Sequence, residues 1–262
     1  MNTLETLILG IVQGLTEFLP VSSSGHLELV KAIFGSDYEK QQGLLVTITL
    51  HAATALSTLF VFRRDIVSIL FDLLQFKKGE SLNFTIKIVI SMIPAVIIGL
   101  FFEDFISTLF DGKIALVGAM LIITALVLCL ADRVKENNKK LNYSNALSIG
   151  LAQAIAILPG ISRSGTTIAL AVLLKIDRDK AARFSFLMVI PLIIGSMTKS
   201  ILDGDLTHES TALFPLIVGF LSAFITGVFA CQWMLALVKK SQLKYFSIYC
   251  VVIGFIAIFL SL

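Results

Sequence analysis

The sequence predicts an all-α polytopic membrane protein, built as an inverted-topology repeat with six transmembrane helices and two re-entrant helical hairpins. Of its 262 residues, 56% are hydrophobic and only 15% are charged, and the apolar residues are gathered into long runs. A run of about 20 apolar residues is long enough to cross a bilayer. A motif of glycine, glutamine and serine also recurs with the same spacing in each half of the chain, which is the mark of an internal repeat.

The same composition excludes a disordered chain, a disulfide scaffold and an ordinary soluble enzyme. Twenty-one Lys and Arg against 18 Asp and Glu give a net charge of +3, which is too small to indicate a nucleic-acid partner. Cys129, Cys231 and Cys250 lie inside apolar runs, so we expect free thiols and no disulfide or metal cluster. The first apolar stretch lacks a basic start and carries Gln13 and Glu17, so we expect no cleavable signal peptide.

Six segments are long and apolar enough to be predicted as membrane spans. The clearest is Ile114–Ala131, because it contains no charged residue. The weakest lies at 184–202, because Lys199 interrupts its end. The six predicted spans are 44–62, 84–102, 114–131, 184–202, 212–238 and 246–262.

Two further apolar regions, 4–34 and 146–175, are broken in the middle by Pro, Gly and Ser, at 20–25 and 159–165. Each half has roughly 10–15 residues, which is too short for a helix to cross the hydrocarbon core. Broken helices at membrane depth are stable only where protein surrounds them or where they line a wet cavity. We therefore predict two re-entrant helical hairpins.

The distribution of Lys and Arg among the loops predicts the orientation, because basic loops stay in the cytoplasm. Fifteen of these residues lie in loops on one side of the predicted topology, namely 63–83, 132–145, 175–183 and 239–245. The other side holds only three, namely Lys31, Lys40 and Lys113. Both termini are then expected outside, with the first hairpin entering from outside and the second from the cytoplasm.

The repeat has an offset of 140 residues, since segment 10–25 matches segment 150–165. Each segment begins with Gly-x-x-Gln, passes a proline and ends in a serine cluster followed by glycine. Each copy contains one hairpin and three spans, and because three is odd the second copy inserts upside down. We expect one membrane domain over 1–262, with repeat 1 at about 1–140 and repeat 2 at about 141–262. In such folds the binding site lies where the broken helices meet.

Both serine clusters come just before a helix restarts, which makes the two breaks candidates for an anion site. Helix N-termini offer free N–H groups and a partial positive charge, serine hydroxyls add donors, and Arg163 supplies a planar fork that suits phosphate. In the simpler alternative, the serines only cap helices and Arg163 pairs with Glu17. The candidate substrate-binding residues are Gln13, Ser22, Ser24, Gly25, Ser162, Ser164, Gly165 and Thr166.

Acid–base chemistry is suggested by the residues around the first break. Glu17 lies four residues after Gln13, on the same helical face, and a buried carboxylate beside a phosphate site can ligate a divalent cation or act as a base. His26 follows Ser23 by three positions, so its imidazole could activate that serine or a water. His51 lies in an apolar span without an obvious partner, and we expect it to be structural. The candidate catalytic residues are Glu17, Ser23, His26 and Arg163, with Glu17 as the candidate metal ligand.

The motifs at 13–26 (QGLTEFLPVSSSGH) and 159–165 (PGISRSG) resemble those of the bacterial undecaprenyl-diphosphate phosphatase family (UppP or BacA, the bacitracin-resistance proteins). The resemblance extends over nearly the whole chain in length, span count and motif order. It implies hydrolysis of undecaprenyl diphosphate to the monophosphate, which recycles the lipid carrier for cell-wall synthesis at the bacterial plasma membrane. It also implies activation by Mg²⁺ or Ca²⁺ and an active site open to the extracytoplasmic side.

In this resemblance the family's catalytic serine, histidine and arginine fall on Ser23, His26 and Arg163, and its glutamate motif falls on Gln13 and Glu17. Glutamine at position 13 fits the family pattern but removes one carboxylate that a metal could use. Attack by Ser23 and attack by an activated water both remain open.

The expected partners are a polyprenyl diphosphate lipid and the membrane, with no nucleic acid, and the sequence leaves the oligomeric state open, a homodimer included. The main alternative function is that of a secondary transporter or lipid flippase, because inverted repeats with broken helices are common among transporters. A third possible function, besides phosphatase and transporter, is that of a lipid-binding protein without catalysis.

Overall fold

The computed structural model describes residues 2–34, 40–109, 112–135, 139–202 and 212–261. These residues form helices α1 to α12 and no strand, apart from an isolated β-bridge between Lys139 and Ile176. The helices are α1 (Thr3–Phe18), α2 (Ser23–Phe34), α3 (Lys40–Val61), α4 (Arg63–Leu74), α5 (Glu80–Phe101), α6 (Glu103–Leu109), α7 (Ile114–Asp132), α8 (Tyr143–Ile155), α9 (Arg163–Leu173), α10 (Arg178–Leu202), α11 (Leu213–Lys239) and α12 (Leu243–Leu260).

Five helices among the described residues are long and apolar enough to cross a membrane, namely α5, α7, α10, α11 and α12. They correspond, to within two residues at the ends where a span extends beyond its helix, to the predicted spans 84–102, 114–131, 184–202, 212–238 and 246–262. The remaining predicted span, 44–62, corresponds to α3, which bends by 77° into α4. Counting that bent pair as one span gives six. The predicted all-helical, multi-pass membrane class is therefore confirmed.

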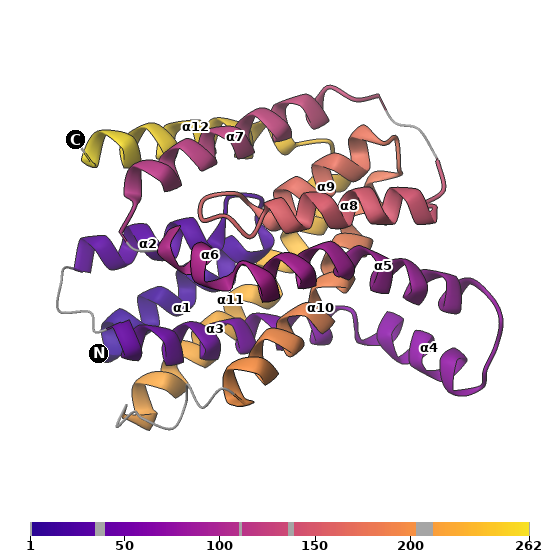
Figure 1. Cartoon of the computed structure of the whole chain (residues 1–262), viewed down its shortest axis with the longest axis horizontal. Coiled ribbons are helices and arrows are strands. Elements are labelled where there is room, and N and C mark those ends of the chain that lie inside the picture. Colours follow the sequence, from indigo (N-terminus) through magenta and orange to yellow (C-terminus); the bar gives the residue numbers. More distant parts are fainter. Residues whose placement is uncertain (1, 35–39, 110–111, 136–138, 203–211, 262) are drawn as a thin grey trace.

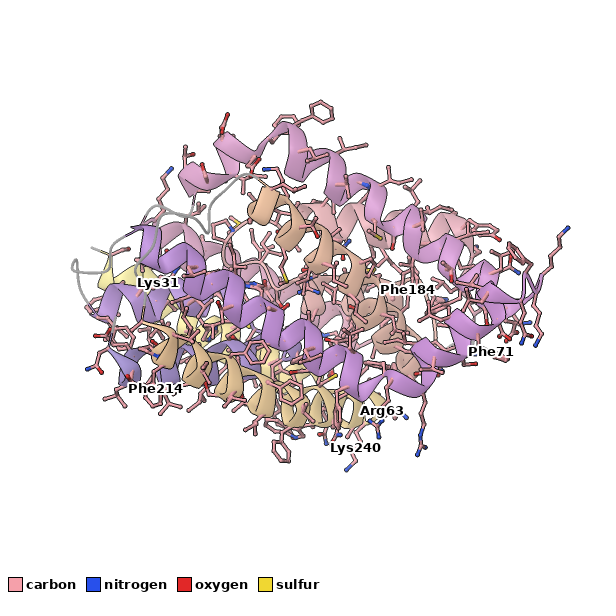
Figure 2. All side chains as sticks on the ribbon, turned by 90° about the horizontal axis from the view of Figure 1, so that it is seen from below. Lys31, Arg63, Phe71, Phe184, Phe214 and Lys240 are labelled. Carbon is pink, nitrogen blue, oxygen red and sulfur yellow. The ribbon has the colours of Figure 1, made fainter. Side chains whose placement is uncertain are left out.

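The helices run roughly along one long axis, and both chain termini lie at the same end of the bundle (Figure 1). Helix α11 packs against both α1 and α3, α7 packs along α12, and α8 packs against α5. Helix α4 projects from the opposite end and buries none of its residues (Figure 1). Seen from below, Arg63 and Lys240 lie toward that same end, whereas Lys31 and Phe214 lie toward the other (Figure 2).

Glycine allows two of these helix pairs to approach backbone to backbone. A Cβ added at Gly14 of α1 would lie only 2.6 Å from the carbonyl oxygen of Ala223 in α11. Between α7 and α12 the contact is reciprocal: a Cβ at Gly118 would lie 2.6 Å from the Gly254 carbonyl oxygen, and one at Gly254 would lie 2.7 Å from that of Gly118. Small residues at the contact are the usual way in which membrane helices pack closely.

The end of α1 is anchored in the core by an aromatic cluster. Phe18 is 1% exposed and makes an edge-to-face contact with Phe186 of α10, with ring centroids 5.8 Å apart. Phe186 also contacts Phe62, at 6.2 Å. Buried aromatic pairs of this kind add packing energy and restrict ring orientation. The anchor therefore fixes the position of Glu17, the residue just before Phe18.

The outer surface of the bundle is apolar. Large side chains such as Phe229, Trp233 and Phe255 are more than half exposed, at 68%, 55% and 62%. Exposed apolar surface on this scale indicates contact with membrane or protein. Together with the long apolar helices, it fits a bundle that faces lipid.

Candidate active site

The first break in the chain separates α1 from α2, and local sequence explains it. Leu19 adopts an extended conformation, as expected of a residue that precedes proline. Ser22 takes a φ of 70°, which is rare for a residue with a side chain. Its hydroxyl then accepts a hydrogen bond from the Gly25 amide at 3.2 Å, so Ser22 caps the restarting helix.

The second break separates α8 from α9 and is built in a similar way. Gly160 has a φ of 93°, and a Cβ there would lie 2.5 Å from the Val117 carbonyl oxygen in α7. Position 160 therefore needs glycine both for its backbone conformation and for space. Ser162 caps α9 by accepting a hydrogen bond from the Gly165 amide at 3.1 Å, the counterpart of the Ser22 cap.

The two breaks meet near the middle of the bundle (Figure 1). Arg163 Nη2 donates a hydrogen bond to Glu17 Oε1 and forms an ion pair with it. Ser164 Oγ donates to the Leu19 carbonyl oxygen at 3.3 Å. The helix N-termini of α2 and α9, each with its serine cap, are thereby brought to one place.

Glu17 is the centre of the hydrogen-bond network, because three side chains donate to its carboxylate. Arg163 binds Oε1, while Ser23 Oγ and Gln13 Nε2 donate to Oε2 at 2.7 and 3.1 Å. Glu17 itself is 7% exposed. A buried carboxylate needs this kind of pairing, since isolated charges are costly in an apolar environment.

A cavity of about 150 Å³ lies against this network. Its polar lining combines a guanidinium, a carboxylate, an imidazole and several hydroxyls. The lining residues are Thr16, Glu17, Ser23, Ser24, His51, Ala156, Ile157, Ile161, Ser162, Arg163 and Ser164. The cavity therefore offers cationic and hydroxyl donors, beside two helix N-termini that favour an anion.

Six of the predicted site residues line this cavity, namely Glu17, Ser23, Ser24, Ser162, Arg163 and Ser164. The other six are not among the lining residues. Gln13 is buried against Glu17, the Gly25 and Gly165 amides are held by the serine caps, and Ser22 supplies one of those caps. Thr166 and His26 are also outside the lining.

The expected pairing of His26 with Ser23 is not present. One turn into the helix, the His26 ring reaches back to the residue four positions earlier, and its Nδ1 donates to the Ser22 carbonyl oxygen at 2.8 Å. Its Nε2 is 2.8 Å from the Tyr249 hydroxyl of α12, and the two rings are stacked. Both ring nitrogens are thus engaged, and Ser23 has Glu17 as its partner instead.

Sequence reasoning missed two polar residues of the lining, Thr16 and His51. The expectation that His51 is merely structural took no account of a pattern in its own helix. Thr47, His51, Thr54 and Thr58 recur at spacings of four, three and four residues, which places them on one face of α3. A polar stripe in an apolar span is the signal that could have identified His51.

The described residues contain no cluster of three or more His, Cys, Asp or Glu that could hold a metal ion by protein ligands alone. Among the described residues that line the cavity, Glu17 is the one with a carboxylate. What the site can do chemically follows from its donors: it can bind a multiply charged tetrahedral anion and present a serine hydroxyl, with a carboxylate within 2.7 Å of that hydroxyl.

Known proteins resemble the chain over nearly all of its length. The family model "Bacitracin resistance protein BacA" matches residues 6–256. An undecaprenyl-diphosphatase of Christiangramia forsetii is 57% identical, with 98% of each chain covered. The undecaprenyl-diphosphatase of Bacteroides thetaiotaomicron is 45% identical, with both chains covered completely. That of Methanococcus vannielii is 39% identical, with 98% of this chain and 99% of its own covered.

Proposed function

Since the chain belongs to the bacitracin resistance protein BacA family, we propose that it hydrolyses undecaprenyl diphosphate to undecaprenyl phosphate and phosphate at the cavity between the two breaks. The protein is an integral membrane phosphatase that returns the lipid carrier to cell-wall synthesis. The observation that carries the proposal is the joining of Arg163, Glu17 and Ser23 in one network beside the cavity. A charged diphosphate head fits that cavity, and the apolar exterior of the bundle suits the prenyl tail.

The arrangement in the membrane is part of the proposal: six spans and two re-entrant hairpins, in inverted repeats at about 1–140 and 141–262. Reciprocal contacts support it. Helix α1 packs on α11, and α8 packs on α5. In each pair, the first helix of one repeat contacts the second span of the other repeat. Thr124 of α7 holds the second break, accepting from the Ser162 amide at 3.0 Å, while Tyr249 of α12 holds His26 beside the first.

The loop charges support an orientation with the basic loops in the cytoplasm and both termini outside. Arg63 and Lys240 lie toward the end of the bundle opposite to Lys31, in agreement with that assignment (Figure 2). We place the protein in the plasma membrane, with its active site reached from the extracytoplasmic side.

Substrate binding follows from the donors at the cavity. Arg163 can turn from Glu17 to the diphosphate and hold two of its oxygens with its planar fork. The first-turn amides of α2 and α9 and the hydroxyl of Ser24 add further donors. Phosphoryl transfer depends mainly on positioning and on neutralising charge in the transition state, so these groups carry much of the catalysis.

In the proposed reaction, Ser23 Oγ attacks the terminal phosphorus while Glu17 Oε2, 2.7 Å away, takes its proton. The bond from phosphorus to the bridging oxygen breaks, and that oxygen receives the proton as undecaprenyl phosphate leaves. Water then attacks the phosphoserine, and Glu17 passes a water proton to Ser23 Oγ as phosphate departs. Direct attack by a water that Glu17 activates is the alternative route. In both routes His26 acts by holding the Ser22 carbonyl oxygen.

The residues around Glu17 fit a hard divalent cation, Mg²⁺ or Ca²⁺, that takes most of its ligands from the substrate. Both ions prefer oxygen ligands, and Mg²⁺ is often bound by one or two carboxylates together with phosphates. Glu17 would be the carboxylate, and the buried Gln13 Oε1 is an oxygen beside it with no hydrogen-bond partner among the described residues. When bound, the cation would neutralise charge on the diphosphate.

The proposal is tested with purified protein in detergent and a polyprenyl diphosphate labelled at its terminal phosphate. We expect release of labelled phosphate and, after rapid acid quenching, a labelled phosphoserine at Ser23 that the Ser23→Ala variant lacks. Ser247→Ala is the matched control, because that hydroxyl is bonded to the Ala125 carbonyl oxygen away from the cavity. Folded protein that releases no phosphate, yet moves the lipid between leaflets of a vesicle, would indicate a flippase instead.

A further inference from the structure

The ring of His51 is oriented by a hydrogen bond to its own helix, and the reaction proposed above gives it no role. It lies on α3, which packs against α1, and it lines the same cavity as Glu17. One turn further along α3, Thr54 Oγ1 accepts from Gln13 Nε2 at 3.5 Å, so this face of α3 is directed toward the Gln13–Glu17 face of α1. The His51 ring and the Glu17 carboxylate border one cavity, so a single small molecule bound there can contact both.

The tautomer of His51 follows from the hydrogen bond that its Nδ1 makes. Its Nδ1 is 2.8 Å from the Thr47 carbonyl oxygen, and a carbonyl oxygen can only accept, so Nδ1 carries the hydrogen. In the neutral ring, Nε2 is then an acceptor with an open lone pair. Nε2 has no hydrogen-bond partner among the described residues, in contrast to His26, where both ring nitrogens are engaged.

An acceptor in this position needs a donor that the substrate does not supply, because the oxygens of an ionised diphosphate only accept hydrogen bonds. The lining hydroxyls of Thr16, Ser23 and Ser164 already donate to other oxygen atoms, and the Glu17 carboxylate already accepts from three side chains. The reaction does contain one further donor, the attacking water. When the oxygen of this water faces phosphorus, each of its two hydrogens can donate a hydrogen bond. Two acceptors therefore hold the water in that orientation.

We propose that His51 is a further catalytic residue, whose Nε2 accepts a hydrogen bond from the attacking water while Glu17 accepts the other. This inference rests on the proposed phosphatase function and holds for both of its routes. The water oxygen bonds to phosphorus as the bond from phosphorus to the leaving oxygen breaks. The leaving oxygen is Ser23 Oγ in the route through phosphoserine and the bridging oxygen in the route of direct water attack. Glu17 takes one water proton and returns it to that leaving oxygen, so His51 gains no proton.

The test compares three α3 variants by steady-state phosphate release from a polyprenyl diphosphate. His51→Ala should lower kcat by about 100-fold and leave KM within about twofold, because a misplaced reactant costs rate rather than binding. His51→Gln should recover most of that loss, since its amide oxygen is also an acceptor. Thr49→Ala is the matched control, because that hydroxyl bonds the Leu45 carbonyl oxygen of its own helix.

The result that would overturn the inference is full kcat in His51→Ala, an effect on KM alone, or a His51→Gln variant as slow as His51→Ala. Equal thermal unfolding temperatures for the three variants and the unmodified protein show that loss of rate is not loss of fold. Phosphate release by the unmodified protein reports on the proposed function separately, so failure of the inference and failure of that function are distinguishable.

Discussion

Arg163 and Glu17 form an ion pair that joins the two breaks, although the residues are 146 positions apart in the chain. The pair joins a buried carboxylate to a partly buried guanidinium: the side chain of Glu17 is 5% exposed and that of Arg163 is 21% exposed. It also means that substrate must compete with Glu17 for the guanidinium. Before substrate binds, the Glu17 carboxylate therefore occupies the position at the Arg163 guanidinium that a diphosphate oxygen would take.

Arg163→Lys should lower phosphate release by at least about 100-fold, because a lysine ammonium cannot hold two phosphate oxygens in one plane. The ion pair with Glu17 survives in this variant, so the protein should remain folded and inserted. Arg183→Lys is the control, since Arg183 pairs with Asp65 at the surface. Near-normal activity of the Arg163 variant would contradict bidentate binding.

Glu17→Gln should lower activity by about 100-fold or more and flatten the response to Mg²⁺. The amide can still accept from Arg163 and Ser23, but it can neither take a proton nor offer a charged ligand. Activity is measured over a Mg²⁺ titration after treatment with a chelator. Glu28→Gln, which changes an ion pair with Lys31 outside the cavity, should keep the response. An unchanged Mg²⁺ dependence in Glu17→Gln would exclude Glu17 as a ligand.

Tyr249→Phe should lower the free energy of unfolding by about 0.5–1.5 kcal/mol, the usual net contribution of one hydrogen bond. Activity should fall only a few-fold, because the His26 ring keeps its bond to the Ser22 carbonyl oxygen. Thermal unfolding in detergent measures the change, with Tyr245→Phe as the control on the same helix. Full loss of activity in Tyr249→Phe would show that the tyrosine hydroxyl takes part in the reaction.

Gly14→Ala should destabilise the protein by about 1–3 kcal/mol, because the added Cβ would overlap backbone atoms of α11 and force the helices apart. Gly99→Ala is the matched control, since a Cβ there meets nothing within 4 Å. Both variants are compared by thermal unfolding. Equal stability would mean that α1 and α11 do not pack as closely as the structure has them.

A cysteine at Lys139 should react with a membrane-impermeant reagent only from the cytoplasmic side, as the loop charges require. Lys113→Cys should show the reverse. Both are made in a chain whose Cys129, Cys231 and Cys250 are replaced, and labelling is compared in intact cells and inverted vesicles. Labelling of both positions from the same side would exclude the proposed topology.

Composition and periodicity were sufficient to predict the membrane class, the six apolar segments and the two breaks, because each depends on local residues alone. The contact of Arg163 with Glu17 could also be predicted from the sequence, because two short broken helices at membrane depth must bury their charges together. From the sequence alone, that contact is an alternative to anion binding. The structure contains both the ion pair and a cavity beside it, so the two ideas are compatible.

The partners of His26 could not be predicted in the same way. Its hydrogen bond goes to Ser22, a residue whose φ is positive, and its contact with Tyr249 joins positions 223 residues apart. Helical spacing alone pointed to Ser23 instead. The bend after α3 was missed for a related reason: Arg63 and Arg64 ended the predicted span, but nothing local indicated that a second helix follows at 77°.

The mutual contact of Gly118 and Gly254 restricts how this protein can change over evolution. Each residue is already the smallest available, and each faces the other's main chain, so a larger residue at one cannot be offset by a smaller one at the other. A single compensating substitution within this pair is therefore not available, and any relative that keeps the crossing has to keep both glycines.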